Sequence, residues 1–167
     1  MTPVPVEALR ARYGVAVADA RRLGAAELEL LADEAGSLLS EARAIDVLTW
    51  AALTFGDRLV VASSMADGVV AHLASRARPG LAVLFLDTGL HFPETLGTRD
   101  ALAATLDIEV LDIRPTRSVA QQELDHGPRL WDTDPDRCCE LHKVQPLARA
   151  LAPYRAWVTG IRGDETA

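Results

Sequence analysis

The stretch LVVASSMAD (residues 59–67) decides the fold class of this sequence. Its first four residues are apolar, and the five that follow supply two hydroxyl groups and a carboxylate. A short apolar run bounded by a turn is typical of a strand that is buried on both faces of a parallel sheet. We therefore predict a strand at Leu59–Ala62 with a strand-to-helix loop after it.

Three more short apolar runs follow, separated by stretches with helical periodicity. Strands that alternate with helices at this spacing indicate βαβ units and an α/β fold with a parallel sheet. The predicted strands are Leu59–Ala62, Ala82–Leu86, Ile108–Ile113 and Ala156–Thr159, and the predicted helices are Gly68–Arg78, Glu94–Leu106, Ser118–Leu124 and Cys139–Leu151.

Before residue 57 the pattern is purely helical. Apolar residues recur at three- and four-residue steps from Ala25 to Phe55. Gly36 and Ser37 are expected to divide this segment, with Ser37 as the N-cap of the second helix, and Gly56 is expected to end it. We expect one domain over residues 1–167, in which a helical segment (1–56) caps an α/β core (57–167).

Composition excludes several classes of protein. A formal net charge of -7 argues against a nucleic-acid-binding surface, which needs clustered Lys and Arg. Residues 1–14 contain no apolar segment typical of a secretion signal, and no run approaches the roughly 18 apolar residues that span a bilayer, so we expect a cytoplasmic protein with no membrane partner. The GxGxxG and GxxxxGK[ST] motifs are both missing, which disfavours a dinucleotide-binding Rossmann site and a P-loop NTPase.

The strand-to-helix loops are the expected site, because open parallel sheets bind ligands beyond the carboxyl ends of their strands. The loop at 63–67 can hold a phosphate or sulfate at a helix N-terminus, although Ser63 or Ser64 can equally act as an N-cap. Asp87 can tie down its own loop or accept hydrogen bonds from a ribose or an adenine amino group. Among the four histidines, His91 has the best claim to this site.

Cys138 and Cys139 form the third feature. Adjacent Cα atoms are about 3.8 Å apart, which is too close for an unstrained disulfide. The turn signal at 134–136 puts both thiols near a helix start, where the macrodipole favours thiolates. Adjacent helical side chains diverge by about 100°, so the pair suits two irons of one cuboidal cluster better than one zinc ion. The alternative is two small core residues, since free cysteine is often buried.

Together these segments resemble the sulfonucleotide reductases, the adenylyl-sulfate and phosphoadenylyl-sulfate reductases of assimilatory sulfate reduction. The resemblance extends from Leu48 to the last residue. It rests on SSMAD (63–67), LDTG (86–89) with HFPET (91–95), CC (138–139) with KV (143–144) and PL (146–147), and TGIR (159–162).

The resemblance implies a Rossmann-like parallel-sheet domain of the adenine-nucleotide-hydrolase type that binds adenosine 5′-phosphosulfate or AMP. The implied reaction is thiolate attack on the sulfate sulfur, release of AMP, and reduction by thioredoxin to sulfite for cysteine biosynthesis. The implied cofactor is a [4Fe–4S] cluster. The implied substrate-binding residues are Ser63, Ser64, Asp67, Asp87, Thr88, Gly89, Gly160 and Arg162, and the implied cluster ligands are Cys138 and Cys139, with Lys143 beside the cluster.

The family's second cysteine pair and its nucleophilic cysteine do not occur in these 167 residues. We therefore expect a piece of an adenylyl-sulfate reductase, with the nucleophile beyond Ala167, that is inactive alone and holds no stable cluster. Exposed apolar surface is expected to favour homo-oligomers. Three alternatives are open: a non-catalytic nucleotide-binding member of the family, a phosphoadenylyl-sulfate reductase, and a related ATP pyrophosphatase, which Ser64 and Met65 at the usual glycine positions disfavour.

Overall fold

The strands form a parallel sheet in the order β3-β2-β1-β4. The computed structural model describes residues 5–160. Val61 of the central strand β1 lies opposite Val83 of β2 and Val158 of β4. The predicted α/β class is confirmed, three strands match the prediction to the residue, and β2 begins one residue earlier. The strands are β1 (Leu59–Ala62), β2 (Leu81–Leu86), β3 (Ile108–Ile113) and β4 (Ala156–Thr159).

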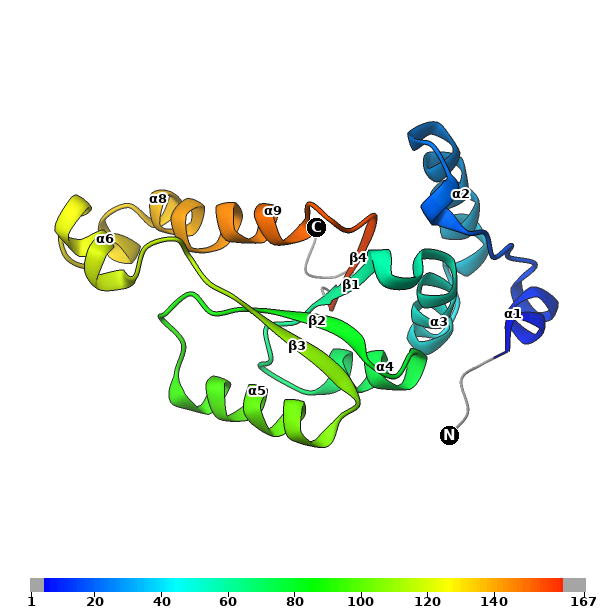
Figure 1. Cartoon of the computed structure of the whole chain (residues 1–167), viewed down its shortest axis with the longest axis horizontal. Coiled ribbons are helices and arrows are strands. Elements are labelled where there is room, and N and C mark those ends of the chain that lie inside the picture. The colour runs from blue at the N-terminus through cyan, green and yellow to red at the C-terminus, as the bar shows by residue number, and fades with distance from the viewer. Residues whose placement is uncertain (1–4, 161–167) are drawn as a thin grey trace.

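Helices cover both faces of this sheet. In Figure 1, α4 and α5 lie below it, and the helical run that ends in α9 lies above it. No helix within residues 5–160 is both long and apolar enough to cross a bilayer. The core helices are α4 (Val69–Ala77), α5 (Pro93–Thr105), α6 (Val119–His126), α7 (Leu130–Thr133), α8 (Pro135–Cys139), the π-helical turn η3 (Glu140–Val144) and α9 (Gln145–Leu151).

The helix predicted at Cys139–Leu151 begins four residues earlier, at Pro135. Asp134 is its N-cap, and the Asp134 carboxylate accepts a hydrogen bond from the backbone N–H of Arg137. Proline suits this first position because its missing N–H would have no partner inside the helix. The cysteines therefore lie one turn into the helix, which the turn signal at 134–136 had indicated.

The N-terminal segment contains α1 (Val6–Tyr13), α2 (Ala25–Leu39), α3 (Ala44–Phe55) and two 3-10 turns, Ala20–Arg22 and Gly56–Arg58. The predicted break at Gly36 and Ser37 is wrong, because α2 runs through both residues. The Ser37 hydroxyl bonds back to the Asp33 carbonyl, so it bonds within the helix interior and caps no helix start. Gly56 ends α3 as predicted, with a φ of 56°.

The start of α3 is fixed by a buried carboxylate. Asp46 has a fully buried side chain that accepts hydrogen bonds from Arg43, Tyr13 and Arg12. The hydrogen bonds from Arg43 are the main reason that the pKa of Asp46 lies below its ordinary value. These bonds join α1 to α3, and α3 packs against β1, β4 and α4. The expected cap on the sheet is therefore built mainly from α3, whereas α2 projects away from the sheet (Figure 1).

Candidate nucleotide and cluster site

The loops after β1, β2 and β3, together with the end of β4, lie at one edge of the sheet, because all four strands are parallel. This edge therefore carries the predicted substrate residues from Ser63 to Gly160. Arg162 falls outside the described residues.

The β1 loop is held by its own side chains. The Ser63 and Ser64 hydroxyls accept hydrogen bonds from the backbone N–H groups of Met65 and Ala66, and the Asp67 carboxylate accepts one from Val69. Neither serine is an N-cap, because Gly68 occupies that position in α4. The serines form short turns of the kind that Ser and Thr favour in loops.

Met65 fixes the direction of the β1 loop. It adopts a φ of 55°, although it is not glycine, and its side chain is completely buried in the core. A left-handed conformation costs an ordinary residue about 1–2 kcal/mol. Burial of the Met65 side chain offsets this cost, so a methionine supplies the turn that glycine would provide in a looser loop. No local sequence pattern predicts this conformation of Met65.

The β2 loop is tied down through Asp87 and Thr88. One Asp87 oxygen accepts a hydrogen bond from the Gly89 N–H, and the other lies 3.1 Å from Nε of Arg114 in the next loop. Thr88 is buried, and its hydroxyl accepts from the Leu90 N–H. Of the two roles predicted for Asp87, the structure therefore shows the first, a tie within its loop.

Gly160, at the end of β4, is required by close packing. A Cβ atom at this position would lie 2.6 Å from Cγ2 of Val70 in α4. Real Cβ atoms do not approach that closely, so a side chain at residue 160 would displace α4 from the strand end. Glycine therefore lets the β4 end lie directly beside the N-terminus of the helix that follows the β1 loop.

The cysteine pair lies beside the β2 loop. Cys138 is buried and Cys139 is exposed, and neither forms a disulfide. Burial is the main reason that the pKa of the Cys138 thiol is raised, followed by the neighbouring Cys139, whereas Lys143 acts in the opposite direction. Thr88, His91, Lys143 and both cysteines line one hollow of about 280 Å³. Lys143 and both cysteines thus line the same hollow, and the role of Lys143 beside a cluster stays a prediction.

The cysteines fit a cluster as two of its ligands. They open into the same hollow from adjacent positions of one helix, and Lys143 places a positive charge there. Within the described chain, no group of three or more His, Cys, Asp or Glu side chains is arranged to hold a metal ion. The sequence contains two cysteines in all, so a [4Fe–4S] centre needs ligands from outside these 167 residues.

His142 joins the helical run of α8 and η3, the cysteine helix, to the β2 loop. No local sequence pattern predicts this contact. Its Nδ1 lies 2.8 Å from the Thr88 carbonyl oxygen in a buried contact. A carbonyl oxygen only accepts, so Nδ1 carries the proton. The spacing of four residues from Cys138 would have placed His142 on the cysteine face of the helix.

His91 has a structural role. Its Nε2 bonds the Leu86 carbonyl at 2.8 Å, and its ring packs on Phe85 with a centroid separation of 4.9 Å. These contacts close the β2 loop over the end of its own strand. They place the imidazole in the wall of the hollow that both cysteines line, the cysteine hollow.

Residues 58–167 match the model of the phosphoadenosine phosphosulfate reductase domain. The chain belongs to this reductase domain family. The match covers the whole sheet, the loops after β1 and β2 and the cysteine helix, and it leaves the N-terminal helical segment outside. The resemblance recognised in the sequence is therefore confirmed.

Two curated relatives are adenosine 5′-phosphosulfate reductases. That of Streptomyces coelicolor is 59% identical over 140 residues, which cover 84% of this chain and 59% of the relative. That of Mycolicibacterium smegmatis is 49% identical over 139 residues, which cover 83% and 59%. The chain thus spans about three fifths of the length of these curated relatives.

A solved structure has the same fold. The phosphoadenylyl-sulfate reductase of Candida auris, in a phosphate complex, is similar with a TM-score of 0.66 and 26% sequence identity. The similarity covers 83% of this chain and 70% of that one. The four-stranded sheet and its helices are therefore the scaffold of the family.

Proposed function

We propose that this chain supplies the nucleotide site and half of the cluster site of an adenosine 5′-phosphosulfate reductase. The observation that carries the proposal is the shared hollow in which Thr88 of the β2 loop faces Cys138, Cys139 and Lys143. The names of the curated relatives support the same activity. They also favour the unphosphorylated substrate over its 3′-phosphorylated form.

The substrate would lie across the loop edge of the sheet. Parallel sheets bind ligands at this edge, where backbone N–H groups and helix N-termini attract anions. The loop from Ser63 to Asp67 would receive the phosphosulfate group, and residues 87–89, Gly160 and Arg162 would contact the nucleotide. The phosphate complex of the Candida auris relative supports an anion site in this scaffold.

The cysteine pair would contribute two thiolate ligands to a [4Fe–4S] cluster. When bound, such a cluster supplies a compact metal centre whose charge the surrounding protein tunes. Lys143 would offset part of its negative charge. The His142–Thr88 hydrogen bond would hold the cysteine helix at a fixed position relative to the nucleotide loop.

The reaction would begin with attack of a cysteine thiolate on the sulfate sulfur. A sulfur–sulfur bond forms, the sulfur–oxygen bond to the phosphate breaks, and AMP leaves. A dithiol of thioredoxin then reduces the thiosulfonate, releases sulfite and becomes a disulfide. The nucleophile would be a cysteine outside the 167 residues, because both cysteines present are assigned to the cluster.

A sulfite-release assay tests whether the 167-residue chain can catalyse the reaction alone. We expect the 167-residue chain to release no sulfite from adenosine 5′-phosphosulfate and reduced thioredoxin. After anaerobic reconstitution with iron and sulfide, we expect it to bind less than one cluster per chain. The matched control is the Cys138→Ser/Cys139→Ser variant, which should lose any residual iron while retaining the fold. Turnover by the short chain, or four irons per chain, would contradict the proposal.

A non-catalytic nucleotide-binding protein is the alternative function. The reading frame beyond codon 167 distinguishes the two, because the reductase requires a Cys-x-x-Cys pair and a later cysteine. We propose in addition that the reductase acts in the cytoplasm and that the isolated chain self-associates. A monomeric mass at every protein concentration in light scattering would contradict the self-association.

A further inference from the structure

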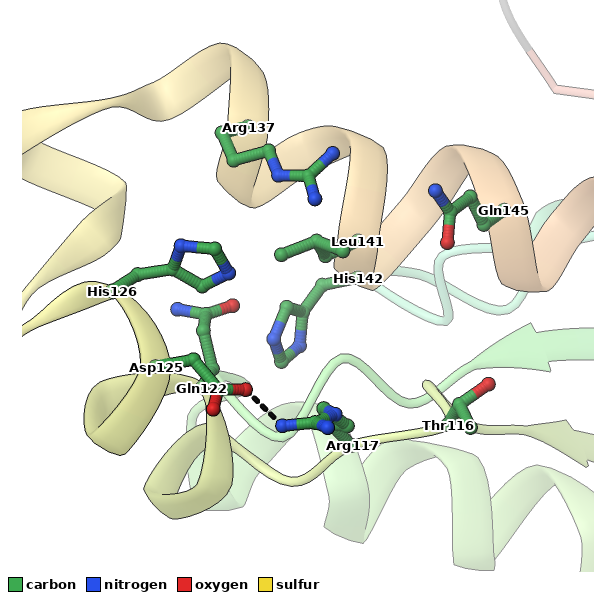
Figure 2. A pocket seen from close by; sticks show the side chains of 9 residues that line it. All are labelled: Thr116, Arg117, Gln122, Asp125, His126, Arg137, Leu141, His142 and Gln145. Atoms are coloured by element: carbon green, nitrogen blue, oxygen red, sulfur yellow. Dashed lines mark hydrogen bonds and ion pairs between the residues drawn. The ribbon is translucent and has the colours of Figure 1, made fainter.

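A second hollow, of about 390 Å³, lies beside the cysteine helix and includes part of the loop after β3. Its walls come from α6 and from the helical run of α8, η3 and α9, and the loop after β3 forms its floor. Figure 2 shows polar side chains from all three elements directed into one space. Six of the residues that line it are Thr116, Arg117, Gln122, Asp125, His126 and Arg137.

Gln122 is the buried residue of this hollow. It lies on α6 with only 2% of its surface exposed, and neither its amide nitrogen nor its amide oxygen has a hydrogen-bond partner within residues 5–160. An unpaired buried amide is unfavourable, and most such groups in proteins are satisfied by a neighbour, a water or a ligand. In Figure 2 the Gln122 amide lies between the His126 and His142 rings, in the interior of the hollow.

The charges around Gln122 favour an anion. Arg117 and Asp125 form an ion pair, so their charges offset each other. Arg137 forms no ion pair with another described residue, and in Figure 2 its guanidinium points into the hollow. One positive charge therefore remains without a counter-ion. His126 and Thr116 also line the hollow.

We propose that this hollow is a binding site for a small tetrahedral oxyanion of the sulfate or phosphate class. Guanidinium groups bind such anions through paired, charge-assisted hydrogen bonds, and the Gln122 amide would donate a further one from the buried side. The site lies beyond the proposed function, because it includes neither the 63–67 nor the 87–89 loop. His142 forms part of the wall of both hollows, so the two sites are neighbours.

The test is a titration of the 15N-labelled 167-residue chain with sodium sulfate, and separately with sodium phosphate, at constant ionic strength balanced by chloride. We expect saturable shifts of the Gln122 side-chain amide and of the α6 backbone signals with either oxyanion, and none with chloride. Shifts that follow chloride equally, or that never saturate, would overturn the proposal.

Two variants locate the site. Arg137→Ala should weaken sulfate binding about tenfold, because it removes the unpaired charge. Gln122→Leu should weaken it similarly without lowering the unfolding temperature, since it replaces two unpaired buried atoms by an apolar group of similar size. Arg149→Ala, an exposed arginine on α9, is the matched control and should bind sulfate as the unchanged chain does. Unchanged sulfate affinity in Arg137→Ala would overturn the proposal.

AMP separates this site from the nucleotide site. AMP should bind the Arg137→Ala variant as tightly as the unchanged chain, and saturating AMP should leave the sulfate shifts of Gln122 in place. Displacement of sulfate by AMP, or an equal loss of AMP affinity in Arg137→Ala, would show that the hollow belongs to the nucleotide site and would overturn the proposal. These results do not depend on whether the complete protein reduces adenosine 5′-phosphosulfate.

Discussion

The two halves of the molecule differ in what they bury. Residues 9–85 contribute every member of the main hydrophobic core, including Leu59, Met65 and Phe85. The arm from Arg114 to Leu151 buries little apolar surface, and two of its most buried side chains, Gln122 and His142, are polar. The difference indicates that folding stability resides mainly in the first half, whereas the arm presents buried polar groups and has little apolar core of its own.

The largest effect is expected at Phe85, which is fully buried on β2 beneath the guanidinium of Arg99. Phe85→Ala should lower the free energy of unfolding by about 3–5 kcal/mol because it opens a cavity in the core. In the arm, Leu124→Ala should change it by less than about 0.5 kcal/mol, since Leu124 is 87% exposed. Urea denaturation measures both. Similar losses would remove the contrast between the halves.

Asp46 comes next, as the buried charge of the first half. Asp46→Ala should cost about 2–3 kcal/mol by removing hydrogen bonds from charged partners. Because its pKa is lowered in the folded state, chiefly by hydrogen bonds from Arg43, the folded carboxylate holds a proton less tightly than the unfolded one. Its contribution is therefore complete above about pH 4 and is lost as the pH falls through the folded pKa.

The pH dependence has its own control. The free energy of unfolding of the unchanged chain should fall more steeply below about pH 4 than that of Asp46→Asn, which has no carboxylate to protonate. Parallel curves for the two proteins would show that Asp46 contributes no pH-dependent stability.

Gly160 tests the contact between the end of β4 and α4 of the first half. Gly160→Ala should cost about 2 kcal/mol because its Cβ would overlap Val70, as insertions into packed sites typically do. The double variant Val70→Ala/Gly160→Ala should destabilise less than the sum of the two single variants, because the smaller residue makes room. Strict additivity in urea denaturation would argue against the contact.

The smallest effect is expected at His142. His142→Ala leaves the Thr88 carbonyl without its partner and should cost about 1 kcal/mol. The loss should be local: amide hydrogen exchange should quicken over residues 87–92 and α8, with little change in β1. Uniformly faster exchange across both halves would show that the arm and the core unfold as one unit.

The sequence predicted the strands better than the contacts between distant segments. Strand positions followed from apolar runs such as Leu59–Ala62, because burial on both faces leaves a local pattern. The π-helical turn at Glu140–Val144 and the Gln122 hollow depend on contacts between distant segments, which no local pattern encodes. The predicted helix break was misplaced because Ser37 bonds within α2. The Asp46 cluster that fixes the start of α3 was not predicted, because its residues come from both α1 and α3.

In the site, motifs predict which residues take part, but they do not predict the contacts that those residues make. The cysteine pair, Lys143 and Thr88 were recognised by their motifs, and the structure brings them to one hollow. The tie between Asp87 and Arg114 and the bond from His142 to Thr88 arise only when the loops converge. Motifs mark which side chains take part, and the packing of the loops determines what each one bonds.

Calorimetric titration of AMP tests the central claim most directly, that the loop edge of this chain is a nucleotide site. The unchanged chain should bind one AMP, Asp87→Ala should weaken the affinity about tenfold or more by releasing the β2 loop, and Asp33→Ala, on the distant helix α2, should bind as the unchanged chain does. Absence of AMP binding by a folded chain, or equal affinities in all three proteins, would contradict the account.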